Sequence, residues 1–235
     1  TNPPLALESE LALVNVHLSY KDAETPTLTD VSLKIQKGSF SAFVGKTGAG
    51  KSTLIDLVLG LLTPSSGRIT IDKVDIQTNL GGWQKQIGYV GQNIVLIDDT
   101  IRNNIALGVA ENQIDDTKIW QSLEAAQLDE FVRNQPDKLD TKIGERGARL
   151  SGGERQRLGV ARALYSDPSI LILDEATSAL DDNNQELIMN VLNQLKQQKT
   201  IIMITHRLET VKYCDNVFSV EDGTVVNIKS SDAPI

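Results

Sequence analysis

One eight-residue segment constrains the fold of this chain more than any other feature. It reads Gly45, Lys46, Thr47, Gly48, Ala49, Gly50, Lys51 and Ser52, and it fits the pattern G-x-x-x-x-G-K-[ST]. The apolar stretch Phe40–Val44 precedes it, and residues 52–62 follow with Leu, Ile and Val at helical spacing. A strand, a Gly-rich loop and a helix in this order allow backbone N–H groups and a helix N-terminus to surround phosphate oxygens. The segment predicts a phosphate-binding loop, with a plain Gly-rich turn as the alternative.

The last residues of this loop suit a nucleoside triphosphate. Lys51 is placed to reach the β- and γ-phosphates, and the Ser52 hydroxyl is a suitable ligand for Mg²⁺. Thr53 follows directly, and we count it with the loop among the residues expected to bind the nucleotide.

A second segment carries two adjacent acids. Residues 170–173 are Ile-Leu-Ile-Leu, which predicts a buried strand, and Asp174 and Glu175 follow at its end. In parallel sheets, ligands bind at the carboxyl ends of the strands. We therefore expect Asp174 in the Mg²⁺ shell and Glu175 as the base that polarises a water aimed at the γ-phosphate. The alternative is that both acids only cap a following helix.

Composition limits the class of protein. The chain has 235 residues, of which 40% are hydrophobic and 23% charged, as in a globular domain with a buried core. Its 23 basic and 31 acidic residues give a net charge of −8, which disfavours a generic basic grip on nucleic acid. The single cysteine, Cys214, excludes an internal disulfide framework and a Cys-rich zinc site; we expect a reduced, buried thiol.

Targeting and membrane segments are not predicted. No apolar run approaches the ~18 residues of a membrane-spanning helix. Residues 1–6 lack the basic and long apolar regions of a secretory signal, and the missing initiator Met indicates a fragment or a processed chain.

The remaining patterns alternate between strands and helices. Alternating or continuous apolar residues predict strands at 14–20, 31–35, 40–44, 68–72, 170–173 and 200–205, and a hairpin around Asp222-Gly223. Helical spacing of Leu, Ile and Ala predicts helices near 52–62, 119–128, 158–164 and 187–195. This order argues for an α/β fold, with residues 92–162 as a mostly helical insertion.

A third segment points to a family. Residues 150–157 read Leu-Ser-Gly-Gly-Glu-Arg-Gln-Arg, and Ser151, Gly152 and Gly153 would offer a hydroxyl and close-approach amides at a helix N-terminus. This segment resembles the signature of ABC-type ATPases. In that family the signature serves the ATP of the partner subunit. The resemblance implies a head-to-tail dimer in which two ATP molecules lie between phosphate loop and opposing signature; a homodimer and a heteromeric pair both stay open.

Four further positions match the family in order. The resemblance implies that Tyr20 stacks on adenine, that Gln92 contacts Mg²⁺ or the attacking water, and that His206 senses the γ-phosphate and orients Glu175. Tyr20 could instead be a strand core residue, and a lone glutamine or histidine would ordinarily be structural. Residues 178–181, Ser-Ala-Leu-Asp, match the segment that crosses the dimer interface; Asp181 could also be a helix N-cap.

The resemblance covers nearly the whole chain and implies its architecture. The fold class is α/β: a P-loop NTPase fold of the ABC ATPase type, with a RecA-like core, an N-terminal antiparallel β subdomain and an inserted helical subdomain. We place the β subdomain and core at residues 1–91 and 163–235, and the helical subdomain at about 92–162.

Two stretches resemble the exporter branch of the family. Residues 141–147, Thr-Lys-Ile-Gly-Glu-Arg-Gly, are similar to the loop that touches the membrane part of exporters, and residues 99–105 are similar to the exporter pattern T-I-R-x-N-I. The text around Gln92 is similar to ATP-binding domains of bacterial flippases for lipid-linked oligosaccharides and of polysaccharide exporters. Two departures are small: Glu154 stands where Gln is commoner, and the turn at residues 72–75 lacks Gly.

These resemblances imply the motor domain of an ABC exporter or flippase. We expect an Mg²⁺-dependent ATPase on the cytoplasmic side of a membrane, the inner or plasma membrane if the source is bacterial. It would be attached near Gln92 and residues 141–147 to a transmembrane domain absent from this chain, and its cargo would be a lipid-linked oligosaccharide, a lipid or a polysaccharide.

The first alternative is a soluble ABC ATPase acting on nucleic acid. Three features oppose it: the short stretch of sequence between Gln92 and Ser151, the presence of one ATP-binding cassette rather than two, and the negative net charge. A GTPase or kinase with the same loop is the second alternative, which the signature and His206 oppose.

Overall fold

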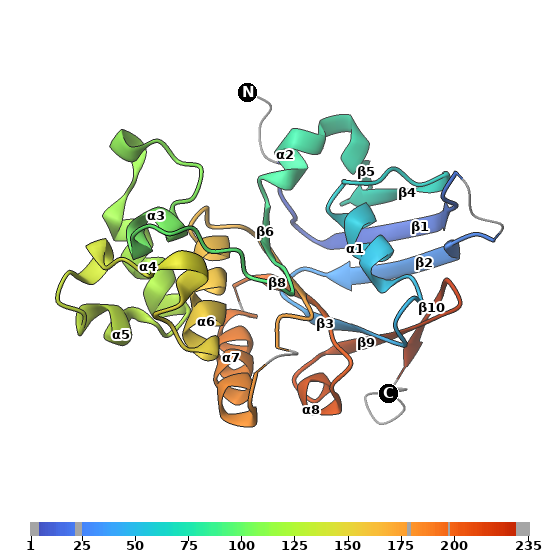
Figure 1. Cartoon of the computed structure of the whole chain (residues 1–235). Coiled ribbons are helices and arrows are strands. Elements are labelled where there is room, and N and C mark those ends of the chain that lie inside the picture. Colours follow the sequence, from blue (N-terminus) through green and yellow to red (C-terminus); the bar gives the residue numbers. More distant parts are fainter. Residues whose placement is uncertain (1–4, 22–24, 178–179, 197, 229–235) are drawn as a thin grey trace.

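The computed structural model of the chain describes residues 5–21, 25–177, 180–196 and 198–228. Two sheets stand beside a group of helices at one end of the molecule (Figure 1). The sheets are an antiparallel sheet of four strands and a mainly parallel sheet of six.

The antiparallel sheet is built from the first part of the chain. Its strands are β1 (Glu10–Leu18), β2 (Leu28–Gln36), β4 (Ser66–Ile71) and β5 (Val74–Asp75), in the order β2-β1-β4-β5. In β2 the apolar residues alternate with exposed polar ones, so that one face of the strand is buried. The strand expected at residues 14–20 lies earlier, and it ends at Leu18 before reaching Tyr20.

The turn after β4 explains the missing glycine. Asp72 and Lys73 both have a positive φ, 47° and 72°, in the left-handed region that favours glycine. The Asp72 carboxylate accepts hydrogen bonds from the backbone N–H groups of Glu8, Ser9 and Glu10 at 2.7, 2.8 and 2.8 Å. These bonds tie the start of β1 to the turn, a contact that glycine could not make.

The six-stranded sheet forms the centre of the molecule. Its strands are β3 (Phe40–Val44), β6 (Ile87–Val90), β7 (Ile170–Asp174), β8 (Thr200–Ile204), β9 (Asn216–Glu221) and β10 (Thr224–Ile228), in the order β10-β9-β3-β8-β7-β6. All neighbours are parallel except β9 and β10, which form the predicted hairpin. The carboxyl ends of the parallel strands therefore meet at one edge of the sheet.

The helices cover both faces of this sheet. They are α1 (Lys51–Val58), α2 (Leu80–Gln84), α3 (Ile101–Ile105), α4 (Asp116–Ala125), α5 (Asp129–Arg133), α6 (Gly152–Leu164), α7 (Asp182–Leu195) and α8 (Leu208–Val211). Short 3-10 helices lie at Ile76–Asn79, Glu111–Gln113, Lys138–Asp140 and Glu145–Gly147. The helix expected at residues 52–62 is thus shorter, and the one expected near 119–128 ends at Ala125, before Leu128.

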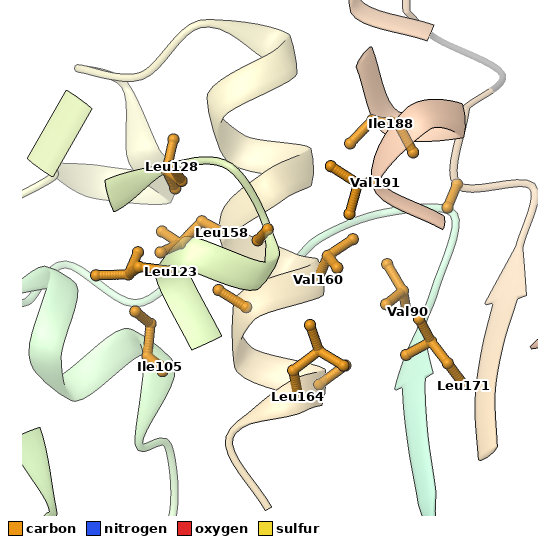
Figure 2. Packing of buried hydrophobic residues seen from close by; sticks show 14 of the residues in the cluster. Val90, Ile105, Leu123, Leu128, Leu158, Val160, Leu164, Leu171, Ile188 and Val191 are labelled. Carbon is orange, nitrogen blue, oxygen red and sulfur yellow. The ribbon is translucent and has the colours of Figure 1, made fainter. Parts of the chain in front are cut away.

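Two hydrophobic cores lie on opposite faces of the parallel sheet. Ile170 and Ile172 of β7 point into a core shared with α1 and the antiparallel sheet, whereas Leu171 and Leu173 point into a core shared with α3–α7. This two-sided burial explains the uninterrupted apolar run of β7. Figure 2 shows α6 in the middle of the second core, with Leu158 on the side of Leu123 and Val160 on the side of Val191.

The segment between β6 and β7 is helical, with α6 as its last helix. It forms one isolated β-bridge, between Thr100 and Lys142. Helix α6 continues to Leu164, and its end packs on β6, where a Cβ on Gly88 would lie 2.6 Å from the Ala163 carbonyl oxygen. The exact subdomain boundaries, 1–91, 92–162 and 163–235, stay a prediction.

Candidate functional site

The carboxyl edge of the parallel sheet gathers most of the expected site residues. The phosphate loop follows β3, Gln92 follows β6, Asp174 ends β7, and His206 follows β8. Because these four strands are neighbours in the order β3-β8-β7-β6, segments far apart in the sequence arrive at the same place.

The phosphate loop is an open, exposed turn next to a cavity. The cavity has a volume of about 450 Å³ and is lined by Gly45, Lys46, Thr47, Gly48, Ala49, Val220, Glu221 and Asp222. Gly45 has φ 145°, and a Cβ there would lie 2.2 Å from the Val220 carbonyl oxygen, so only glycine fits. Gly50 has φ 107° and precedes the first residue of α1, which places the N-terminus of that helix at the loop.

Lys51 is held in place by the loop itself. Its Nζ donates hydrogen bonds to the carbonyl oxygens of Gly45 at 2.7 Å and Lys46 at 2.8 Å. The residue is only 6% exposed, and burial lowers the pKa of its ammonium group, although Glu175 and Asp174 act in the opposite direction. An ammonium group has three donors, so one is left for a phosphate oxygen.

Tyr20 lies on the surface beside the start of α1. It is 47% exposed, and its hydroxyl is 3.3 Å from the Thr53 Oγ1. The alternative of a strand core tyrosine is therefore wrong, because Tyr20 lies outside β1 and outside the core. Its ring is free to stack on a base, and Ser52 next to Thr53 is also exposed.

Asp174 makes a contact that the sequence did not predict. The Tyr89 hydroxyl donates a hydrogen bond to Asp174 Oδ2 at 3.3 Å. Burial raises the pKa of Asp174, with a smaller opposite effect from this hydrogen bond. Burial, together with Asp174, raises the pKa of Tyr89 to about 12, so the hydroxyl keeps its proton.

Glu175 contacts two of the other expected catalytic residues, Gln92 and His206. Gln92 Nε2 donates a hydrogen bond to Glu175 Oε2 at 3.0 Å, and His206 Nδ1 lies 3.6 Å from Glu175 Oε1. Glu175 also has a left-handed backbone, φ 49°, fixed by a hydrogen bond from its N–H to the Ile204 carbonyl. Strained backbone that the surrounding structure holds in place is typical of functional sites. The geometry thus joins Glu175 to Gln92 and to His206. The contact with His206 was predicted and the contact with Gln92 was not, and the catalytic roles of all three stay a prediction.

The signature segment forms the N-terminus of α6. Ser151 is the N-cap: its hydroxyl accepts the Glu154 N–H at 3.2 Å, and its own N–H donates to the Glu154 carboxylate at 2.7 Å. Glu154 therefore completes a capping box, which Gln would complete equally well. Ser151 and Gly152 are exposed, whereas Gly153 is buried against α7, where a Cβ would lie 2.0 Å from Asn184 Oδ1.

Asp181 caps α7, as the helix N-cap alternative states. Its carboxylate accepts hydrogen bonds from the backbone N–H and the side-chain amide of Asn184, at 2.9 and 2.7 Å. The signature helix and the helix that Asp181 caps therefore touch through Gly153 and Asn184. Ser178 and Ala179 lie outside the described residues. A role of Asp181 across a dimer interface stays a prediction.

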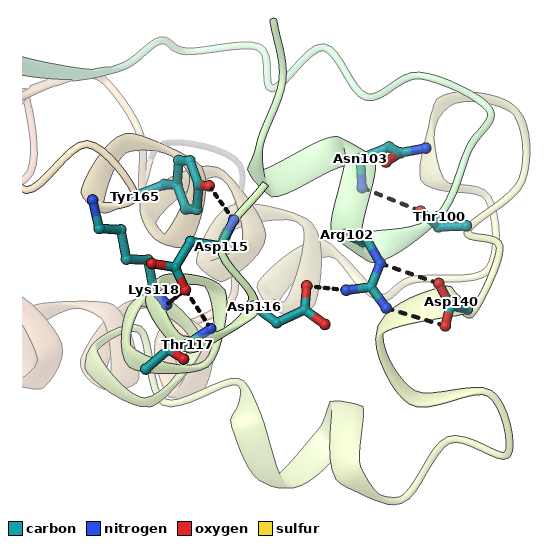
Figure 3. Close-up of polar contacts among 9 residues, drawn as sticks. All are labelled: Thr100, Arg102, Asn103, Asp115, Asp116, Thr117, Lys118, Asp140 and Tyr165. Atoms are coloured by element: carbon teal, nitrogen blue, oxygen red, sulfur yellow. Dashed lines mark hydrogen bonds and ion pairs between the residues drawn. The ribbon is translucent and has the colours of Figure 1, made fainter. Parts of the chain in front are cut away.

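The two exporter-like stretches lie side by side. The Ile101 N–H donates to the Thr141 carbonyl at 3.0 Å, and the Ile143 N–H donates to the Asp99 carbonyl at 3.2 Å. Arg102 adds ion pairs to Asp140 and Asp116, which fasten α3 to both neighbouring segments (Figure 3). Residues 99–105 and 141–147 thus lie side by side, and we call them together the exporter-like surface. A contact of residues 141–147 with a membrane part stays a prediction.

The donor set at the sheet edge fits a magnesium ion that is held mainly by nucleotide. Within the described part of the chain, no group of three or more His, Cys, Asp or Glu side chains could hold a metal. The expected ligands are instead one carboxylate, Asp174, the Ser52 hydroxyl and the Gln92 amide. Mg²⁺ prefers such oxygen ligands and commonly takes only one or two carboxylates from protein, with phosphates and water among its other ligands.

Two remaining sequence predictions concern the thiol and the membrane. Cys214 is partly buried, and burial raises the pKa of its thiol to about 12, so it stays protonated at neutral pH. In the described ranges, no helix has the length and apolar character needed to cross a membrane.

Comparison with known proteins identifies relatives of the whole chain. A family model described as ABC transporter matches residues 28–178. ABC transporter B family member 29, chloroplastic, of Arabidopsis thaliana is 43% identical over 223 residues, which are 94% of this chain and 35% of that protein. A protein of Staphylococcus aureus (strain bovine RF122 / ET3-1), provisionally named a multidrug export ATP-binding/permease protein, is 40% identical over 220 residues, or 93% of this chain and 38% of that one.

A solved structure shares the fold. The structure of a bacterial Atm1-family ABC exporter with ATP bound superposes with a TM-score of 0.84 at 35% identity, over 98% of this chain and 40% of that one. The predicted fold class is confirmed: an α/β ABC ATPase domain with a P-loop NTPase fold. The resemblance to the exporter branch is confirmed as well, and the nucleic-acid alternative is not favoured. The chain spans little more than a third of the length of the two curated relatives.

Proposed function

Because the chain belongs to the ABC transporter family, we propose that it is the Mg²⁺-dependent, ATP-hydrolysing motor domain of an exporter or flippase. The observation that carries this proposal is the contact of Glu175 with both Gln92 and His206, at the sheet edge that also holds the phosphate loop. The ATP in the solved Atm1-family relative supports ATP as the nucleotide.

Each side chain then has a defined task, and Gln92 has two. Backbone N–H groups of residues 45–52 and the Lys51 ammonium bind the phosphates, and the Tyr20 ring stacks on adenine. Glu175 accepts the proton of the attacking water, while Gln92 and His206 fix the direction in which its two carboxylate oxygens point. Asp174, Ser52 and Gln92 would hold Mg²⁺, which neutralises phosphate charge when bound.

The second segment proposed to bind phosphate, residues 151–153, requires a second subunit. Ser151 and Gly152 are exposed at the N-terminus of α6, and no hydrogen bond among the described residues joins residues 151–153 to residues 45–52. A head-to-tail dimer would bring this helix N-terminus to the ATP of the partner. A homodimer is the simplest form, because one chain supplies both segments.

The membrane part is proposed from the relatives and from the exporter-like surface. The Staphylococcus relative is named as an ATP-binding protein and permease in one, and this chain matches 38% of it. We place the contact with a transmembrane domain near Gln92 and residues 141–147, on the cytoplasmic side of a membrane. A lipid-linked oligosaccharide, lipid or polysaccharide cargo stays a prediction from the sequence around Gln92.

Substitution of Glu175 tests this function. Glu175→Gln keeps the side-chain shape but removes the base, so steady-state ATP turnover should fall by about 100-fold or more. ATP binding should persist, and ATP should convert the chain to a stable dimer in sedimentation. Glu186→Gln, on an exposed position of α7, is the matched control and should leave turnover unchanged. Turnover of Glu175→Gln within a few-fold of the unmodified chain would contradict the assignment.

A further inference from the structure

Arg162 is a partly buried cation whose recorded partners are all neutral. It lies in the last third of α6, and its guanidinium donates three hydrogen bonds: Nε to the Asn104 carbonyl at 2.7 Å, Nη1 to the Val95 carbonyl at 2.7 Å and Nη2 to Asn104 Oδ1 at 3.1 Å. No ion pair of Arg162 is recorded in the part of the chain that the structure describes. Each of the three guanidinium nitrogens therefore helps to hold another segment of the chain.

Asn104 is the centre of that segment. It is 0% exposed, and its side chain makes four hydrogen bonds: Oδ1 accepts from Arg162 and from the Ile97 N–H at 3.1 Å, and Nδ2 donates to the carbonyls of Ile97 and Thr100, both at 3.0 Å. A buried polar network with every member satisfied is rigid, because any displacement leaves a desolvated polar group without a partner.

The network adds a polar link between α6 and a surface that Arg102 also fastens to its neighbouring segments. Val95 and Ile97 follow Gln92 closely and expose 74% and 39% of their surface, and Asn104 lies in the stretch 99–105 that pairs with residues 141–147. Helix α6 begins at the signature. One side chain therefore links the helix that carries Ser151 to the surface proposed to contact the membrane part.

We propose that Arg162 is a positioning residue that makes α6 and residues 95–104 move as one body. It would pass the ATP-driven closure at Ser151 to the proposed membrane-facing surface. The inference rests on the proposed function, since it needs an ATP-driven closure. Arginine suits this task because its planar fork fixes direction as well as distance, whereas a lysine would reach one of the three oxygens as a point charge.

The experiment compares Arg162→Lys with Arg133→Lys by hydrogen exchange. Both changes are made in the Glu175→Gln chain, and exchange of the Ile97 and Asn104 amides is measured with and without ATP and Mg²⁺. Arg133 is an exposed arginine on α5 with ion pairs to Glu124 and Asp129, which makes it a matched control.

In the control and in the parent chain, ATP should slow exchange of these amides by about 5-fold or more, the lower end of typical coupling between sites. In Arg162→Lys the change should fall below about 2-fold, a ratio within the scatter of independent sites. ATP-dependent dimers and ATP-linked protection of the amides near Ser151 should persist. A purely structural role would instead raise exchange equally with and without ATP and leave the ratio unchanged.

Asn104→Asp breaks the same network at its other end. It keeps the acceptor for Arg162 but removes the donor to Ile97 and Thr100, so the same loss of the ATP-linked change is expected should Arg162→Lys not fold. Dimers that form normally while the ATP-linked change at Ile97 and Asn104 survives in the variants would overturn the inference alone. A parent chain without ATP-linked change at these amides would also overturn it. Absence of any ATP-dependent dimer in the parent chain would overturn both the inference and the proposed function.

Discussion

Two regions of this molecule are proposed to bind phosphate, the phosphate loop and the start of α6, and different side chains surround them. At the phosphate loop, Lys51 supplies a cation, and Asp174 and Glu175 lie close enough to affect the pKa of that lysine. At the start of α6, Ser151 and Gly152 are exposed, and the carboxylate that accepts the Ser151 N–H belongs to Glu154 of the same helix. The first region combines binding with catalytic groups; the second has binding groups alone.

This difference indicates how the two regions are used. A helix N-terminus attracts phosphate but cannot deprotonate water, so the start of α6 is useful only next to catalytic groups. Gln92 and His206 each contact Glu175, and no hydrogen bond among the described residues joins these three to residues 151–153. The difference supports the proposal that each chain carries a catalytic half and a binding half of a site, which two chains would complete together.

Removal of the Lys51 ammonium group from the phosphate loop should have the largest effect on ATP turnover. Lys51→Ala removes the ammonium group that we propose binds the γ-phosphate, so turnover should fall by about 100-fold or more, as for removal of one preorganised donor to a developing charge. ATP affinity should weaken as well, which nucleotide titration of the monomer measures.

The matched control is Lys85→Ala, at an exposed lysine at the end of α2. It should change neither quantity. Unchanged affinity together with unchanged turnover in Lys51→Ala would refute the interpretation of residues 45–52 as a phosphate loop.

A smaller effect should separate the two tasks of Asp181. Asn is as good an N-cap as Asp, so the Asn184 N–H keeps its acceptor in Asp181→Asn. The second carboxylate oxygen, which accepts from the Asn184 side-chain amide, is lost, so the melting temperature should fall slightly. Loss of the charge should also weaken a contact across the proposed dimer interface and lower turnover by about 3- to 5-fold. Thermal unfolding and ATPase rates of Asp181→Asn and of the neighbouring Asp182→Asn measure both. An equal response of the two variants would assign Asp181 to capping alone.

The sequence predicted what depends on local patterns. The strand Phe40–Val44, the loop after it and the acids at the end of β7 are visible because strand, loop and helix signals are continuous in the chain. Strand ends were less predictable: Tyr20 continues the apolar alternation of β1 but lies beyond it. Alternation alone does not show where pairing with the neighbouring strand stops.

Contacts between residues far apart in the chain could not be predicted from the sequence. Arg162 and Asn104 are 58 residues apart, and neither was predicted as a functional residue from its type or spacing. Asp174 was predicted from the end of its strand, but its partner Tyr89, 85 residues away, was not. Asn184 is similar, because its contact with Gly153 depends on how α7 packs on α6. Such residues are found only when packing brings their segments together, which a single sequence does not encode locally.

Mixed dimers test the division into two halves most directly. Chains with Ser151→Arg keep a catalytic half but lose the binding half, and chains with Lys51→Ala have the opposite defect, so each variant alone should be inactive. The ATPase rate of purified heterodimers of the two is the measurement. The account predicts that it returns to about half the rate of the unmodified dimer, because one of the two sites is then intact. Heterodimers verified by mass that hydrolyse ATP no faster than either parent would contradict it.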